Sequence, residues 1–318
     1  MKDRIKQIFL QNSLLFILFM IILAFSILNK GYLTRSNMVI ILRQASLLAL
    51  LGFAQTLVIL TGCIDLSLGA VISLSTVAFG WMLKTDGLPF MVPVISIVLC
   101  GALLGLITSL IVTKLHIPPF IATFATNYAY RGVAWLLMGS YVYYDFKAEF
   151  RFLGMGELFG IPMPIVFEIF FGILFMILLR NTTLGREIYF IGSNRKTAEY
   201  SGINSNRTIT IAYVISSALA AFTGVLYISR LNAAEPALGT SFSLDSVATS
   251  LIGGTLISGG RGGVWGTAIG AIIIATIKNG MNFLGVSSEM QLMFLGLIIV
   301  FAVFFNEFVN RKLIELSK

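Results

Sequence analysis

The chain has 318 residues, of which 57% are hydrophobic and only 11% are charged. Soluble domains carry about 25% charged residues, so this composition excludes an ordinary water-soluble enzyme and indicates a protein embedded in a membrane. The net charge of +8 does not indicate a nucleic-acid partner, because the basic residues are scattered among apolar segments instead of forming one polar face.

Apolar runs between turn signals and charges predict an all-α polytopic membrane protein with ten transmembrane helices. The predicted spans are 12–29, 38–60, 66–83, 91–113, 120–139, 162–180, 207–228, 245–258, 264–283 and 290–307. Together they are expected to form a single transmembrane domain over residues 1–318. An even number of spans returns the chain to its starting side, so both termini are expected to face the same compartment.

The distribution of lysine and arginine over the loops predicts which compartment this is. Lys2, Arg4 and Lys6 precede the first span, and most of the other loop cations fall on the same side of the membrane. Positive charge is typical of cytoplasmic loops. The chain is therefore predicted to be a multi-pass protein of the cell membrane with both termini in the cytoplasm.

One polar stretch, T-G-C-I-D-L-S-L-G at 61–69, lies where the second predicted span gives way to the third. An ionisable residue at membrane depth normally faces a cavity or a partner, which makes Asp65 a candidate for contact with a transported solute or ion. The favoured alternative is structural: Gly62 ends one helix, and Asp65 or Ser67 caps the first amides of the next. Both interpretations place a helix break beside a translocation path.

Two polar residues share one face of the fifth predicted span. Asn127 and Arg131 are four residues apart, so both would line a polar path if that face were turned toward one. Packing, or extension of Arg131 toward the outer interface, is the alternative.

A second acidic residue, Asp245, begins the eighth predicted span. The strings I-D-L-S-L-G-A-V and L-D-S-V-A-T-S-L each place an acid at the start of a span, but in opposite orientations across the membrane. This is the placement expected of an inverted repeat that relates spans two to five to spans seven to ten, and chance similarity is the alternative.

Two loops are longer than the others. The outer loop, 140–161, contains Tyr141, Tyr143 and Tyr144, which favours an interfacial aromatic belt over contact with a soluble partner. The inner loop, 181–206, is the most polar segment of the chain, and Gly202 is expected to end a short helix within it.

The sequence contains few residues suited to chemistry. No G-x-x-x-x-G-K-[ST] motif occurs, so any ATP hydrolysis must come from another chain. The single histidine, His116, supports no metal site, and Cys63 and Cys100 lie in apolar contexts typical of packed thiols. The chain is therefore expected to have no cofactor of its own and no enzymatic activity.

Four blocks occur in a fixed order along the chain: G-C-I-D-L-S-L-G-A, K-L-H-I-P-P-F-I-A-T, L-G-R-E-I-Y-F-I-G-S-N-R-K-T-A-E-Y-S-G-I-N and L-D-S-V-A-T-S-L-I-G-G-T-L-I-S-G-G-R-G-G-V-W-G-T. They resemble the permease subunits of bacterial ATP-binding cassette importers for ribose and other simple sugars, over about residues 35 to 305. The resemblance implies one translocation path between two permease subunits, identical or similar. It also implies two cytoplasmic ATPase subunits and an external sugar-binding protein.

The resemblance further implies that the inner loop is the cytoplasmic coupling loop, in which a short helix seats in a groove of the ATPase. The coupling-loop residues that match are Gly185, Arg186, Gly192, Asn194, Ala198, Ser201 and Gly202. Importers of other small solutes, such as autoinducer-2, share these blocks. A stand-alone secondary transporter is the remaining alternative, although the sequence shows no proton or sodium relay.

Overall fold

The computed structural model describes residues 13–84, 89, 91–139 and 142–316, with only the backbone described for 13, 302–303 and 305–316. Lys2, Arg4, Lys6 and Tyr141, which entered the sequence-based predictions, lie outside these residues. The long helices are α2 (Ser13–Leu28), α3 (Arg35–Ile59), α4 (Leu68–Leu83), α5 (Met91–Thr113), α6 (Pro119–Met138), α8 (Met163–Asn181), α11 (Ser205–Leu231), α13 (Val264–Phe283) and α14 (Ser288–Leu316). The shorter elements are α7 (Ala148–Met155), α9 (Thr183–Ser193), α10 (Arg195–Tyr200), α12 (Phe242–Ile252), the 3-10 turn η1 (Pro236–Gly239), and the strands β1 (Tyr143–Tyr144), β2 (Glu157–Leu158), β3 (Ile161–Pro162) and β4 (Ala233–Ala234).

The all-α prediction is confirmed, because every predicted span falls on a helix and the described strands have two residues each. Among the described residues, five helices are long and apolar enough to cross a membrane: α3, α5, α8, α11 and α13. The count of ten complete spans is not established. α12 has 11 residues and rises about 16 Å, roughly half of a hydrocarbon core about 30 Å thick.

The predicted bounds of two spans are wrong for the same reason. The span predicted at 66–83 begins as a helix only at Leu68, and the span predicted at 245–258 ends as a helix at Ile252. Gly254, at φ +87°, lies just beyond the end of α12, in a left-handed conformation that does not continue a helix. Apolar composition did not mark these ends, because apolar residues such as Leu66, Leu256 and Ile257 continue beyond the helices.

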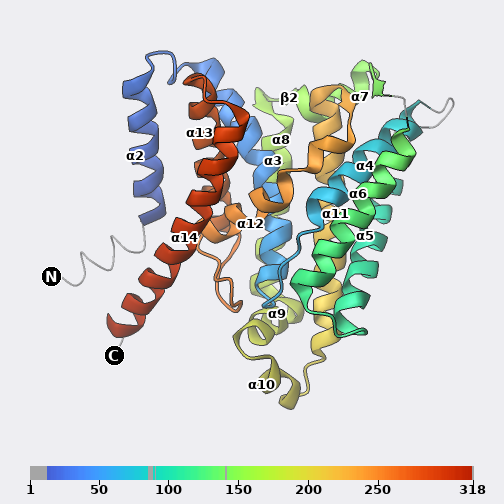
Figure 1. Cartoon of the computed structure of the whole chain (residues 1–318), viewed down its shortest axis with the longest axis vertical. Helices are drawn as coiled ribbons and strands as arrows, with labels where there is room; N and C mark the ends of the chain where they lie inside the picture. The colour runs from blue at the N-terminus through green and yellow to red at the C-terminus, as the bar shows by residue number, and fades with distance from the viewer. Residues whose placement is uncertain (1–12, 85–88, 90, 140–141, 317–318) are drawn as a thin grey trace.

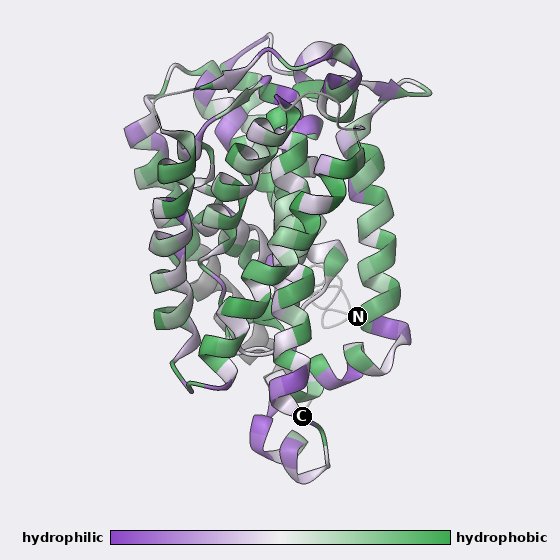
Figure 2. Cartoon of the chain, turned by 90° about the vertical axis from the view of Figure 1, so that its right-hand side faces the viewer, coloured by the Kyte–Doolittle hydropathy of each residue, from purple (hydrophilic) through white to green (hydrophobic). Residues whose placement is uncertain are grey.

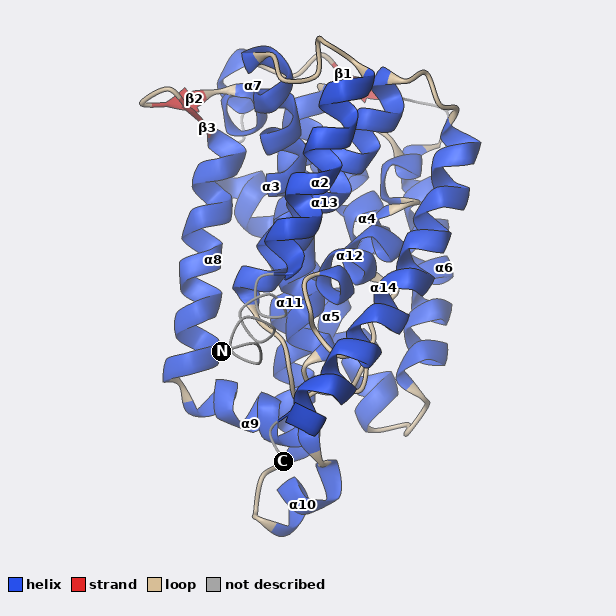
Figure 3. Ribbon diagram, turned by 90° about the vertical axis from the view of Figure 1, so that its left-hand side faces the viewer, coloured by secondary structure: helices blue, strands red, loops and turns tan. Residues whose placement is uncertain are grey.

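The helices of each of the sets α3–α6 and α11–α14, with the short helix α12 included, run in alternating directions through one bundle (Figure 1). α3 descends and α4 ascends in that view, whereas α11 ascends and α12 descends. The lower ends of α2 and α14 point to the side on which α9 and α10 lie (Figures 1 and 3). Hydrophobic residues dominate the middle of the bundle, and hydrophilic residues gather at its two ends (Figure 2). This distribution is the one expected of a protein that spans a bilayer.

Small residues allow the central helices to approach closely. α11 packs along α5, and α13 packs along α3. A Cβ atom on Gly105 of α5 would lie 2.8 Å from the Ser217 side chain, and one on Gly52 of α3 would lie 2.6 Å from the side chains of Thr249 and Thr267. Such contacts replace the hydrophobic driving force that helices lack within lipid.

The upper end of the bundle is covered by the predicted outer loop, which is more ordered than a loop. It contains the helix α7 and the strands β1, β2 and β3. β1 pairs with β4, which follows α11, and β2 pairs with β3. Arg43 of α3 forms an ion pair with Glu157 at 3.0 Å and donates to the Met155 carbonyl at 2.8 Å. These contacts attach the cover to the top of α3.

Candidate functional site: two helix breaks and an interfacial loop

Residues 63–67 connect α3 to α4 as an extended segment inside the bundle. The side-chain amide of Gln55 on α3 forms hydrogen bonds with both backbone groups of Asp65, in the middle of this segment. With its nitrogen oriented toward the Asp65 carbonyl, it donates at 2.9 Å, and its oxygen accepts from the Asp65 amide at 3.2 Å. Thr123 of α6 donates to the carbonyl of Ile64 at 3.3 Å. Non-helical backbone is tolerated at membrane depth only where protein or water supplies such partners.

The side chain of Asp65 is fully buried in this segment. Its Oδ1 accepts a hydrogen bond from the backbone amide of Ser67 at 2.8 Å and another from the Ser67 hydroxyl at 2.6 Å. Its Oδ2 has no hydrogen-bond partner among the described residues. Asp65 therefore closes a turn before α4 instead of capping the helix amides, and Ser67, at the N-cap position, makes no side-chain cap hydrogen bond either.

α12 supplies the cap that α4 lacks. Ser243 accepts from the backbone amide of Gly69 at 3.2 Å and donates to the Leu66 carbonyl at 2.7 Å. Asn127 of α6 donates to both the Leu66 carbonyl, at 2.5 Å, and the Ser243 hydroxyl, at 3.1 Å. A Cβ on Gly69 would overlap the carbonyl oxygen of Gly239, so the two chain segments meet backbone to backbone. The starts of both broken helices thus share one polar crossing.

Asp245 lies in the first turn of α12 and is fully buried. Its Oδ2 pairs with the Nζ atom of Lys278 on α13 at 2.5 Å, and the Lys278 side chain is 27% exposed. The next residue of α13, Asn279, donates to Asn37 of α3 at 2.9 Å. Lys278 thereby offsets the cost of placing the Asp245 carboxylate inside the bundle.

The other two residues predicted for this region lie apart from the crossing. Arg131 makes no ion pair within the described part of the chain, and its Nε is buried without a hydrogen-bond partner. Gly62 is exposed at the lower end of α3, where it adopts φ +81° and its amide donates to the Ile59 carbonyl at 2.8 Å. The structure therefore joins Asn127 to Ser243 at the start of α12 and places Asp65 and Ser67 on either side of the Leu66 carbonyl that both side chains bind. Among the described residues, no hydrogen bond joins Arg131 or Gly62 to α12.

The inner loop forms two helices, α9 and α10, that lie across the lower end of the bundle (Figure 3). Thr182 caps α9 by accepting from the Gly185 amide at 3.1 Å, and a Cβ on Gly185 would overlap the carbonyl of Leu179. Asn194 caps α10 by accepting from the Thr197 amide at 3.0 Å. Glycine and asparagine are thus required by the sharp turns at both helix starts.

The predicted helix end at Gly202 is confirmed. α10 ends at Tyr200, Gly202 adopts φ +83°, and the Ile203 amide donates back to the Ala198 carbonyl at 3.0 Å. Ser201 donates through its hydroxyl to Thr197 at 3.0 Å. This is the closing pattern in which a left-handed residue satisfies the last carbonyls of a helix.

Charged residues cover the outer surface of α9 and α10. Arg186 of α9 is exposed, as are Arg195 and Glu199 of α10, which pair at 3.0 Å. The hydrogen bond from Arg195 lowers the pKa of the Glu199 carboxyl. The pair is exposed on both sides, so it is expected to contribute little to stability.

α9 contacts the lower end of the first helix break directly. A Cβ on Gly192 would overlap the Leu60 carbonyl oxygen and the Gly260 amide nitrogen, and the Gly260 amide already donates to Leu60 at 3.0 Å. Ala198 of α10 is fully buried in an apolar cluster that includes Cys63. The helices of the inner loop are therefore packed against the segment that contains Asp65.

Several residues of the crossing were not singled out from the sequence. They are Gln55, Thr123, Ser243 and Tyr213, the last donating to the Ile64 carbonyl at 3.4 Å. Each is a polar side chain within an apolar helix, which is the one sequence signal that they share. That signal does not distinguish a residue that bonds to its own helix from one that bonds across the bundle.

Lys278→Met is expected to lower the free energy of unfolding by about 3–5 kcal/mol, because it leaves the Asp245 carboxylate buried without a cation. The double variant Asp245→Asn with Lys278→Met should recover most of this loss. Thermal unfolding of the purified chain in detergent measures both. The matched control is Lys114→Met, which removes an exposed lysine. Equal stability of Lys278→Met and Lys114→Met would contradict the role of the pair.

Known proteins resemble the chain over nearly its whole length. Ribose import permease protein RbsC of Bacillus subtilis (strain 168) is 38% identical over 297 residues, covering 90% of this chain and 89% of that protein. D-allose transport system permease protein AlsC of Escherichia coli (strain K12) is 35% identical over 297 residues, covering 93% and 91%. Fructose import permease protein FrcC of Rhizobium meliloti is 29% identical over 313 residues, covering 93% and 85%. No solved structure matches the chain.

The protein family described as branched-chain amino acid transport system / permease component matches residues 37–303. This range includes both helix breaks, the inner loop and every long helix except α2 and the end of α14. The resemblance to importer permeases predicted from four sequence blocks is confirmed: the chain belongs to this family of membrane permease components.

Proposed function

We propose that this chain is the membrane-spanning permease subunit of an ATP-driven importer and that it forms the translocation path for a simple sugar, a pentose or hexose of the ribose class. The observation that carries the proposal is the similarity over about nine-tenths of the chain to proteins named as ribose and allose permeases, at 38% and 35% identity. Importers of solutes such as autoinducer-2 and stand-alone secondary transporters are not favoured by these relatives.

An inverted repeat of α3–α6 and α11–α14 is part of the proposal. When the helices of each set are taken in sequence order, each helix of the first set runs in the opposite direction to its counterpart in the second set (Figure 1). They also exchange partners: α4 packs on α11 while α12 packs on α3, and α4 contacts α6 while α12 contacts α14. Such an arrangement supports ten membrane segments, in which α4 and α12 are the broken pair at the middle of the membrane.

The polar crossing is the proposed part of the path. Asn127 of the first set of helices bonds to Ser243 at the crossing, Asp65 and Ser67 lie in the segment that enters it, and Asp245 follows Ser243 by two residues in α12. Hydroxyl, amide and backbone groups at such a crossing match the hydrogen-bonding capacity of a sugar. Gly62, just beyond the end of α3, and Arg131, in the second half of α6, are proposed only as residues that border the path.

α9 and α10 are the proposed coupling element. Their charged outer surface is free to meet an ATPase, and their inner surface packs against Leu60 and Cys63 at the helix break. Movement imposed from outside would therefore reach the crossing through a short chain of rigid contacts. ATP would be bound and hydrolysed by the partner ATPase subunits, with no cofactor in this chain.

The remaining parts of the proposal follow from the family. A second permease subunit, either a copy or a related chain, would complete the path, and an external binding protein would deliver the sugar. The chain would occupy the cell membrane as one domain, with α9, α10 and both termini in the cytoplasm. The lower ends of α2 and α14, which point to the side of α9 and α10, support this orientation (Figure 1).

Reconstitution tests the proposed function. In proteoliposomes that contain this chain, its ATPase and its binding protein, we expect ATP-dependent uptake of radiolabelled ribose or allose. The chain alone should be inert, because it has no nucleotide-binding motif. Uptake by the chain alone under a proton or sodium gradient would contradict the proposal, as would failure of every monosaccharide to bind the binding protein in a thermal-shift screen.

Asp65→Asn is expected to retain both folding and uptake, because an amide oxygen can still accept from the Ser67 amide and hydroxyl. Asp65→Ala should lower the free energy of unfolding by about 1–3 kcal/mol, since it leaves those two donors buried without an acceptor. Thermal unfolding and sugar uptake are measured on the same preparations. Loss of uptake in a stable, assembled Asp65→Asn variant would instead assign a charge-dependent role to the carboxylate.

Gly192→Ala tests the proposed coupling. The added Cβ would overlap Leu60 and force α9 away from the end of α3. We expect uptake to fall about tenfold or more while the ATPase stays bound. Overpacking costs about 1–3 kcal/mol, and a cost of about 1.4 kcal/mol corresponds to a tenfold change in an equilibrium constant. Gly132→Ala is the control, since nothing lies within 4 Å of its added Cβ. Unchanged uptake by Gly192→Ala would rule out this coupling contact.

A further inference from the structure

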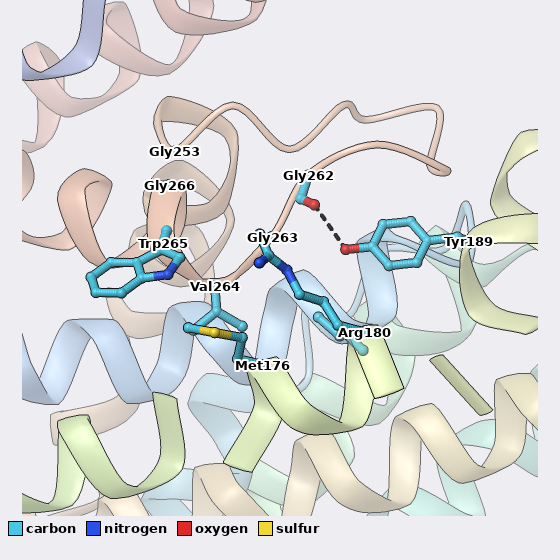
Figure 4. Close-up of a pocket in the computed structure, with 10 residues that line it drawn as sticks. Met176, Arg180, Tyr189, Gly253, Gly262, Gly263, Val264, Trp265 and Gly266 are labelled. Atoms are coloured by element: carbon cyan, nitrogen blue, oxygen red, sulfur yellow. Dashed lines mark hydrogen bonds between the residues drawn. The ribbon is translucent and has the colours of Figure 1, made fainter. Parts of the chain in front are cut away.

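A cavity of about 280 Å³ lies at the lower end of the bundle, between the end of α8, α9 and the start of α13. Its walls include Met176 and Arg180 of α8, Tyr189 of α9, and Gly263 and Trp265 at the start of α13 (Figure 4). None of the residues that line it is acidic. The cavity is separate from the polar crossing, and neither the family nor the proposed transport function assigns it a role.

Arg180 gives this cavity a positive charge. Its side chain extends toward the glycine segment at Gly263 (Figure 4), and the ion pairs of the described residues do not include it. The hydroxyl of Tyr189 donates to the Gly262 carbonyl at 2.9 Å, which fixes the opposite wall. α13 begins here with no side-chain cap, so its first backbone amides add to a potential that favours an anion.

An apolar stripe runs along the exposed face of α8, from the cavity toward the middle of the helix. Ile173, Met176 and Ile177 precede Arg180 by seven, four and three residues, so they share its face of α8. Ile173 and Ile177 are both more than half exposed. Trp265, on the other wall, is 65% exposed, in the position that tryptophan prefers at a membrane boundary.

We propose that this cavity binds the phosphate of a membrane phospholipid, with the acyl chains lying along Ile173 and Ile177. A basic pocket between membrane helices at the cytoplasmic boundary suits an anionic headgroup. Inorganic phosphate shares the headgroup chemistry, but it would make no use of the apolar stripe that continues from Arg180. A bound lipid would contact α8, α9 and α13 together, and so would stabilise the packing of the inner loop against the bundle.

Quenching of Trp265 by brominated lipid tests the proposal without any transport partner. The chain has three tryptophans, so Trp81→Phe with Trp135→Phe leaves Trp265 as the only reporter. The full chain is placed in phosphatidylcholine nanodiscs with increasing brominated phosphatidylglycerol. We expect Arg180→Gln to weaken the relative affinity for phosphatidylglycerol about fivefold, the effect of one basic residue near an anionic surface. Arg180→Lys should recover part of the lost affinity for phosphatidylglycerol.

Lys114→Gln is the matched control, because it removes an exposed cation from the end of α5, outside the cavity. Identical quenching curves for Arg180→Gln and Lys114→Gln would overturn the proposal. Relief of quenching by excess inorganic phosphate would also overturn it, since the cavity would then be a site for a soluble anion.

Native mass spectrometry gives a second readout that needs no tryptophan substitutions. The full chain is released from detergent after incubation with phosphatidylglycerol, and the number of retained lipids is counted. Fewer retained lipids for Arg180→Gln than for Lys114→Gln would support the site, and equal numbers would refute it. This measurement decides the matter even if the single-tryptophan background fails to fold.

Discussion

An extended backbone within a membrane bundle must find hydrogen-bond partners from the protein itself, and much of this structure is arranged around that requirement. Residues 63–67 have no helical partners of their own. Side chains from α3, α6, α11 and α12 supply them, through Gln55, Thr123, Tyr213 and Ser243. Each unsatisfied group would cost several kcal/mol in a medium without water. The break therefore holds four helices in one relative arrangement.

The same requirement explains why the two broken helices meet. α4 begins without a cap of its own, and Ser243 of α12 provides it. The close approach of Gly69 and Gly239 is what lets that hydroxyl reach. The buried carboxylate of Asp245 then adds a charge near this point, and Lys278 of α13 compensates it. A movement of α12 relative to α4 would have to exchange these partners together, which favours discrete states over gradual deformation.

The inner loop is connected to this crossing by contact and not by proximity alone. Gly192 meets Leu60 at the end of α3, and Ala198 is buried with Cys63 two residues before Asp65. The proposed lipid cavity lies beside these contacts. Tyr189 of α9 and the glycine segment before α13, which line the cavity, belong to the same elements that contact the end of α3. The helices α9 and α10, the helix break and the cavity beside Arg180 are thus neighbouring parts of one packed unit.

The sequence by itself determined the membrane class, the position of every long helix, the break near Asp65 and the end of α10 at Gly202, because apolar runs and glycines report local requirements. It placed Asn127 and Arg131 on one face but could not tell that only Asn127 reaches the crossing. The tertiary structure alone decided that Ser243 caps α4, that Lys278 pairs with Asp245, and that α12 is half a span. These features join segments far apart in the chain, and a polar side chain in an apolar helix does not show which distant backbone group it will satisfy.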